Sequence, residues 1–140
     1  MQFSTLFFIF SAATLEAVYA GCFTSGTKWG GERGLAEAAL DELCDPTKHN
    51  SVIFEGFSNG QTKAVCHQLS GDKKADFTVQ WGGAGSSTLA QSDCVLRFKN
   101  EIDGCDQGGS TTTADWTFTS DPNDGTCEPV AKRSSVKFRA

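Results

Sequence analysis

The sequence predicts an α+β domain, in which an antiparallel sheet of about four to five strands carries two packed helices and three disulfides stabilise the fold. Three observations favour this fold class. Two segments repeat apolar residues at helical spacing, two others alternate apolar and polar residues as strands do, and six cysteines follow an apolar N-terminal segment. Helices gathered on one face of such a sheet bury the apolar surfaces of both layers.

A short edge strand is expected at residues 22–25, followed by a glycine-rich turn around Trp29. The first helix should then run from about Glu32 to Cys44, because apolar side chains recur there at helical spacing: Leu35, Ala39 and Leu43. Asp45-Pro46 ends this helix, since a proline disfavours helical backbone in the residue before it.

Three strands are expected between the two helices. Residues 52–57 and 62–69 should pair as a hairpin through Asn59-Gly60, a dipeptide that favours tight turns. Residues 70–72 turn the chain into the third strand, at residues 76–81. In that strand the apolar positions alternate with polar ones: Phe77, Val79 and Trp81. A glycine-rich loop follows at residues 82–87.

The second helix is expected from about Asp93 to Asp103, with Ser92 as its N-cap and Gly104 as its stop. Its buried stripe consists of Cys94, Val95, Phe98 and Ile102.

One further strand is expected near the end of the domain. Residues 115–120 place Trp116 and Phe118 on one face. On either side of this strand we expect irregular structure, a flexible polar loop at residues 110–113 and a turn at residues 121–125.

Residues 1–20 have the features of a secretory signal peptide. Leu6 to Phe10 is an apolar run too short to cross a bilayer, and residues 18–20 offer a small-residue cleavage pattern before Gly21. We therefore expect a secreted, extracellular protein, with one domain at residues 21–127 and a basic tail at residues 128–140. The pair Lys132-Arg133 fits a protease processing site, although a solvated tail explains it more simply.

All six cysteines lie after the signal, and their even number in an exported chain predicts three disulfides. No C-x-x-C pair is present to indicate a metal site. Fifteen pairings are open. A straight helix would hold Cys94 and Cys105 roughly 16 Å apart, which argues against that pair. The set we favour is Cys44–Cys94, Cys105–Cys127 and Cys22–Cys66.

The sequence contains no recognisable catalytic constellation, such as a G-x-S-x-G elbow, a G-x-G-x-x-G motif or a P-loop. Only His49 and His67 would titrate near neutral pH, and a sheet-surface histidine explains His67 more simply than acid–base catalysis. Asp121, Asn123 and Asp124 fail the calcium-loop spacing. We therefore predict no catalytic residue, no metal ligand and no cofactor.

A formal net charge of −5 argues against nucleic acid as a partner. After the signal, no apolar stretch is long enough to span a membrane. Sugar sites combine an aromatic face with polar groups on loops. On that chemistry, the candidate ligand-binding residues are Trp29, Asp76, Gln80, Asp106 and Gln107, with the loop 82–87 and Ser110 as further contributors. Trp81 and Trp116 are assigned to the core, because each shares a strand face with other apolar residues.

Three segments carry a family resemblance: "CFTSGTKWG", "DFTVQW" and "EIDGCDQGGSTTTADWTFTSDPNDGTC". Together they resemble the small secreted glycan-binding lectin first recognised in ink-cap mushrooms, which has many fungal homologues. The resemblance covers nearly all of Cys22 to Cys127. It implies a single α+β sandwich domain that binds carbohydrate and associates with a second copy through sheet edges. It supplies no ligand signature that can be placed residue by residue.

These observations favour a secreted, non-enzymatic protein that binds a glycan or glycoprotein. A rival from another class is a secreted cysteine-rich effector or toxin-like module that binds a host or competitor protein. The basic tail favours this alternative. A third, less favoured alternative is a small secreted hydrolase built on His67.

Overall fold

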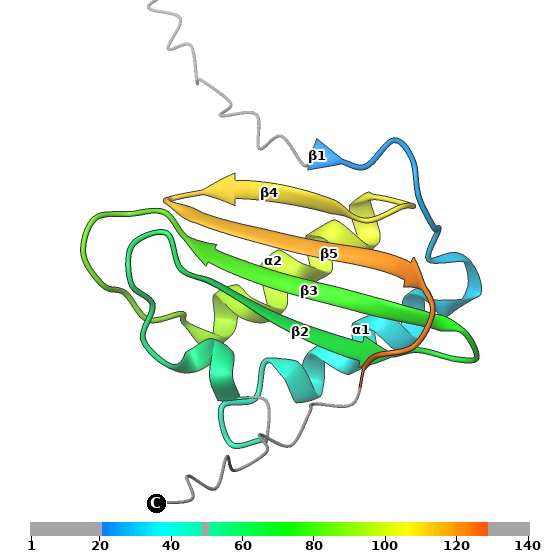
Figure 1. The fold of residues 1–140 in the computed structure, drawn as a ribbon, viewed down its shortest axis with the longest axis horizontal. Coiled ribbons are helices and arrows are strands. Elements are labelled where there is room, and N and C mark those ends of the chain that lie inside the picture. The colour runs from blue at the N-terminus through cyan, green and yellow to red at the C-terminus, as the bar shows by residue number, and fades with distance from the viewer. Residues whose placement is uncertain (1–20, 49–50, 129–140) are drawn as a thin grey trace, which may run out of the picture.

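A computed structural model describes residues 21–48 and 51–128, so the signal segment, His49 and residues 129–140 lie outside the described residues. One layer is an antiparallel sheet and the other consists of two helices on one of its faces (Figure 1). The α+β prediction is confirmed. The sheet order is β1-β4-β5-β3-β2, formed by β1 (Gly21–Cys22), β2 (Thr62–Gln68), β3 (Lys73–Trp81), β4 (Gly109–Thr113) and β5 (Trp116–Asp124).

The helices are α1 (Arg33–Leu43) and α2 (Gln91–Gly104), close to the expected positions. A short 3-10 helix, η1 (Gly30–Glu32), precedes α1. The expected N-cap is wrong, because α2 begins one residue before Ser92 and follows Ala90 without a side-chain cap. No helix in the described part of the chain is long and apolar enough to cross a membrane.

The core lies between the sheet and the two helices, and the alternation predicted for residues 76–81 is confirmed. Phe77 and Val79 are fully buried, and Val79 lies opposite Phe118 of β5. Phe98 of α2 packs edge-to-face on two strand residues, with ring centroids 5.2 Å from Phe77 and 5.0 Å from Phe118. Edge-to-face aromatic pairs add to the stabilisation that burial alone provides.

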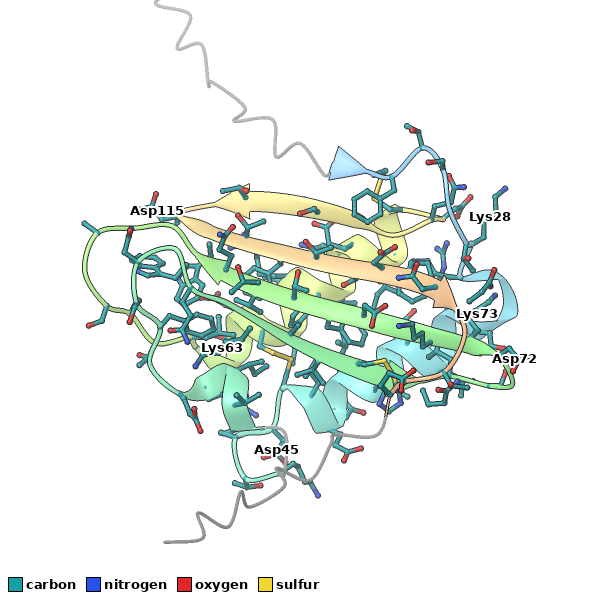
Figure 2. The ribbon with its side chains drawn as sticks, in the orientation of Figure 1. Lys28, Asp45, Lys63, Asp72, Lys73 and Asp115 are labelled. Atoms are coloured by element: carbon teal, nitrogen blue, oxygen red, sulfur yellow. A yellow bond between two sulfur atoms is a disulfide. The ribbon has the colours of Figure 1, made fainter. Side chains whose placement is uncertain are left out.

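The strand expected at residues 52–57 is wrong. Its first part is a 3-10 helix, η2 (Ser51–Phe54), and only Phe57 makes an isolated bridge, to Ser87. The cause is Lys63, which lies beside this segment (Figure 2) and is only 8% exposed. Its ammonium group donates hydrogen bonds to three backbone carbonyls, of Val52 (2.9 Å), Glu55 (2.9 Å) and Gly56 (3.1 Å).

Two segments assigned to irregular structure are strands. Residues 110–113 belong to β4, and residues 121–124 continue β5 beyond its expected end. Both segments are strands because each pairs with a neighbour, β4 with β5 and β5 with β3. A tight turn joins β4 to β5, and its residues Ala114 and Asp115 have φ angles of 49° and 67°. Asp115 lies at the tip of this hairpin (Figure 2). The expected turn begins later, at Gly125, whose φ is 112°.

The disulfide Cys44–Cys94 is confirmed and ties α1 to α2. The other two favoured pairs are wrong, because the bridges are Cys22–Cys105 and Cys66–Cys127. Strand order explains the difference. β1 pairs with β4 rather than β2, which brings Cys22 to the residue after α2, and the chain beyond β5 crosses to β2, where Cys66 lies. All six cysteines lie within the described residues, and none is free.

Candidate functional site

The two helices lie on one face of the sheet, and the opposite face points away from them (Figure 1). We call this opposite face the open face. Strand alternation places on it residues from three neighbouring strands: Lys74, Asp76, Thr78 and Gln80 of β3, Thr117, Thr119, Asp121 and Asn123 of β5, and Ser110 and Thr112 of β4. Most antiparallel sheets with one covered face leave the other to water, so polar residues here are expected.

Two carboxylates meet at one end of the open face. Asp76 and Asp121 lie directly opposite each other in the β3–β5 pairing. Like charges in that position repel. Asn123 offsets the repulsion, because its side-chain nitrogen donates to an oxygen of Asp76 at 2.9 Å and to an oxygen of Asp121 at 3.0 Å. The ammonium group of Lys74 lies 3.3 Å from the same Asp76 oxygen. These four residues form the acidic cluster.

A shallow hollow of about 450 Å³ adjoins the acidic cluster. One wall is the segment 22–26, which includes the half-buried ring of Phe23, and the other is formed by Asp121 and Asn123. The segment is fixed at both ends. The Phe23 backbone N–H donates to the Gly108 carbonyl at 2.9 Å, and the Gln107 side chain donates to the Gly26 carbonyl at 3.1 Å.

Paired side-chain hydroxyls extend the open face across β4 and β5. Ser110 and Thr119 are joined at 2.8 Å, and Thr112 and Thr117 at 2.7 Å. Each hydroxyl has donor and acceptor capacity, so this surface suits a ligand that is itself rich in hydroxyl groups. The hollow, the acidic cluster and the hydroxyl pairs thus form a continuous polar strip.

Of the residues expected to bind ligand, Asp76 lies in the acidic cluster. Gln80 shares the open face but lies four residues along β3, about 13 Å from Asp76. Gln107 fixes the wall of the hollow through Gly26. Ser110 belongs to the hydroxyl pairs. The loop 82–87 follows β3 at its Trp81 end, beyond Gln80 and far from the cluster.

Trp29 and Asp106 lie elsewhere. Trp29 is 0% exposed, so its ring has no face for a sugar, and we leave it out of the site. Its backbone N–H donates to the Asp106 carbonyl at 2.9 Å. The Asp106 carboxylate already forms an ion pair with Arg33 at 2.7 Å. Both residues border a separate small hollow, which also includes Lys28.

The candidate ligand-binding residues predicted from the sequence do not include Phe23, Asp121 or Asn123, which border the hollow. The last two were assigned to a turn on account of the Asp-Pro-Asn-Asp-Gly composition. A signal for them exists in the sequence. From Trp116 to Asn123, every second residue is polar, and this polar set includes Asp121 and Asn123.

His67 does not join the acidic cluster. It lies opposite Ala75 on the helix-facing side of β2, where it borders a small hollow with Leu35 and Glu42 of α1. The open-face carboxylates are on the other side of the sheet. Within the described ranges, no group of three His, Cys, Asp or Glu side chains is arranged to hold a metal ion.

A family model described as Glycan binding domain Y3 matches residues 37–127. The match begins inside α1, ends at the last cysteine and includes the whole acidic cluster. No curated protein matches the sequence significantly.

Proposed function

The chain belongs to the Glycan binding domain Y3 family, and from this premise we propose that it is a secreted, non-enzymatic protein that binds a glycan on the open face. The acidic cluster and the adjoining hollow form the binding site. Asp76 and Asp121 accept hydrogen bonds from sugar hydroxyls, Lys74 donates, and Phe23 offers an apolar surface to the C–H face of a sugar ring.

The arrangement of the acidic cluster is the observation that supports this proposal most strongly. The amide bridge of Asn123 uses one oxygen of each carboxylate and fixes the orientation of both side chains. Each carboxylate therefore presents acceptor capacity without the cost of ordering a mobile side chain at binding. The hollow is shallow, so it suits the side or end of an extended glycan, and affinity per site should be weak.

The same cluster argues against glycoside hydrolysis. The two carboxylate oxygens lie within about 6 Å of one another, since both bind the same nitrogen. That spacing alone would suit a retaining glycosidase. The Asn123 amide, however, fills the gap where the reacting sugar carbon would have to lie. The effector alternative depended on the basic tail, most of which lies outside the described residues.

Replacing Asp121 by asparagine tests the proposed site. Asp121→Asn keeps the side-chain shape but removes the charged acceptor, and hydrogen bonds to charged groups are worth about 1.5–3 kcal/mol. We expect a loss of affinity of about tenfold or more on a glycan array and by calorimetry with the best-bound glycan. Asp41→Asn, the same change at an exposed position on α1, is the matched control and should bind like the wild type.

Equal binding by Asp121→Asn and Asp41→Asn would place the glycan away from the acidic cluster. Release of reducing sugar from the bound glycan by the wild-type protein would overturn the non-enzymatic assignment.

A further inference from the structure

β2 is the outermost strand of the sheet, and α1 lies alongside it (Figure 1). Among the described residues β2 pairs with β3 alone. On its outer side, no backbone hydrogen bond from another described residue reaches it. Such an unpaired edge is a template for a further strand, and folded proteins usually cover it. We call this outer side of β2 the free edge.

A hollow of about 230 Å³ lies beside the last residues of the free edge, between β2 and α1. Leu35 of α1 borders the hollow and is 49% exposed. Glu42 is the acid in the lining, which contains no lysine or arginine. It follows Leu35 by about 10 Å along α1. This end of the free edge therefore suits a segment that brings an apolar side chain and then a cation.

The other end of the free edge also carries an exposed apolar residue. Val52 of η2 is 41% exposed, and its carbonyl accepts a hydrogen bond from Lys63, near the start of β2. Large apolar side chains are exposed at three of the described positions, and two of these are Leu35 and Val52. They lie at opposite ends of β2, which rises about 17 Å from Lys63 to Gln68.

The C-terminal tail begins beside the free edge. Cys127 is bridged to Cys66 of β2, and its backbone N–H donates to the side-chain oxygen of Gln68 at 2.8 Å. Gln68 also borders the hollow that contains Leu35. Residues 129–140 therefore start next to one end of the free edge. A segment tethered so close has a high effective concentration at that edge.

The sequence of the tail matches the free edge in spacing and in charge. Val130 and Val136 are separated by about 20 Å in an extended chain, close to the length of β2. Strand alternation places Lys132 on the same face as both valines. A tail that starts at Gln68 and follows the free edge runs antiparallel to β2. Its lysine then lies within reach of Glu42, while the valines lie at the two ends.

We propose that residues 130–136 pair with the free edge as a sixth strand, antiparallel to β2. Val130 covers the hollow beside Leu35, Val136 packs against Val52, and Lys132 forms an ion pair with Glu42. The occupant is the chain's own tail, because the disulfide of Cys127 holds its first residues at this edge. The pairing is independent of the glycan site on the open face.

Amide hydrogen exchange of the oxidised protein, measured by NMR, tests this inference. The full chain is compared with a chain that ends at Glu128. We expect alternate amides of residues 63–67 to exchange about tenfold or more slowly in the full chain, and alternate amides of residues 130–136 to be protected as well. Equal exchange of residues 63–67 in the two chains would overturn the proposal.

Leu35→Ser and Lys132→Glu test the two kinds of contact separately. Each should speed exchange of residues 63–67 severalfold in the full chain, and Leu35→Ser should have no such effect in the chain that ends at Glu128. The matched controls are Leu96→Ser, at a 58% exposed position of α2, and Lys137→Glu, in the tail beyond the added strand. Both controls should exchange as the wild type does.

Two further results would overturn the proposal. One is an effect of Leu35→Ser that is equal with and without the tail, which would make Leu35 important to the domain alone. The other is a full chain that sediments as a dimer while the shortened chain is a monomer, which would place the tail on a second copy. Neither result would affect the open-face site, which is tested with Asp121→Asn.

Discussion

Truncation of Phe77 to alanine should lower the free energy of unfolding by about 3–5 kcal/mol, as large aromatic truncations in cores do. Phe77 is 1% exposed, lies on β3 between β2 and β5, and packs edge-to-face on Phe98 of α2. The change therefore removes contacts with both layers and leaves a cavity that the rigid sheet cannot fill. Urea unfolding with the disulfides intact measures the effect.

Thr78→Ala is the matched control, because Thr78 is the next residue of β3 and lies on the open face opposite Thr119. Its truncation should change the unfolding free energy by well under about 1 kcal/mol. If the two variants were equally mild, the assignment of core and open faces to β3 would be wrong.

Replacing Lys63 by methionine should lower the free energy of unfolding by about 2–4 kcal/mol. Methionine keeps much of the side-chain bulk but removes the ammonium group, so the carbonyls of Val52, Glu55 and Gly56 lose their shared donor. The ammonium group also lies 4.2 Å from the centre of the Phe57 ring, and that cation–π contact is lost as well. Thermal unfolding gives the loss of stability, and hydrogen exchange of residues 52–57 should become faster.

Lys48→Met makes the same change at an exposed position and should leave stability nearly unchanged. A Lys63→Met protein as stable as Lys48→Met would show that the three carbonyls find other donors and that Lys63 does not hold this segment.

The sequence predicted those parts of the fold that depend on local pattern. The alternation around Phe77 and the helical spacing around Ala39 and Phe98 each involve residues close together in the chain, and the structure confirms the strand and both helices. Of the residues on which the first helix was predicted, Ala39 and Leu43 are buried, whereas Leu35 is 49% exposed. The strand predicted at residues 52–57 was wrong, because the periodicity of a short apolar run does not distinguish a strand from a helix. Its conformation depends on Lys63, a residue outside the run.

Long-range partners account for the other differences. Residues 110–113 and 121–124 are polar or turn-favouring, yet they are strands because each finds a hydrogen-bonded neighbour. The disulfide partners of Cys22 and Cys66 depend on the strand order, which spacing does not reveal. For the same reason Asp76 was a candidate from its chemistry, while its alignment with Asp121 required the β3–β5 register.

The most direct test of the proposed glycan site is an amide NMR titration of the oxidised, isotope-labelled protein with the glycan that it binds best on an array. We expect the largest shifts on residues 22–26, on Asp76 and on residues 119–123, which form the acidic cluster and its hollow or lie beside them. If a bound glycan left all of these amides unshifted, the glycan site would not lie at the acidic cluster, wherever else on the protein its shifts appeared.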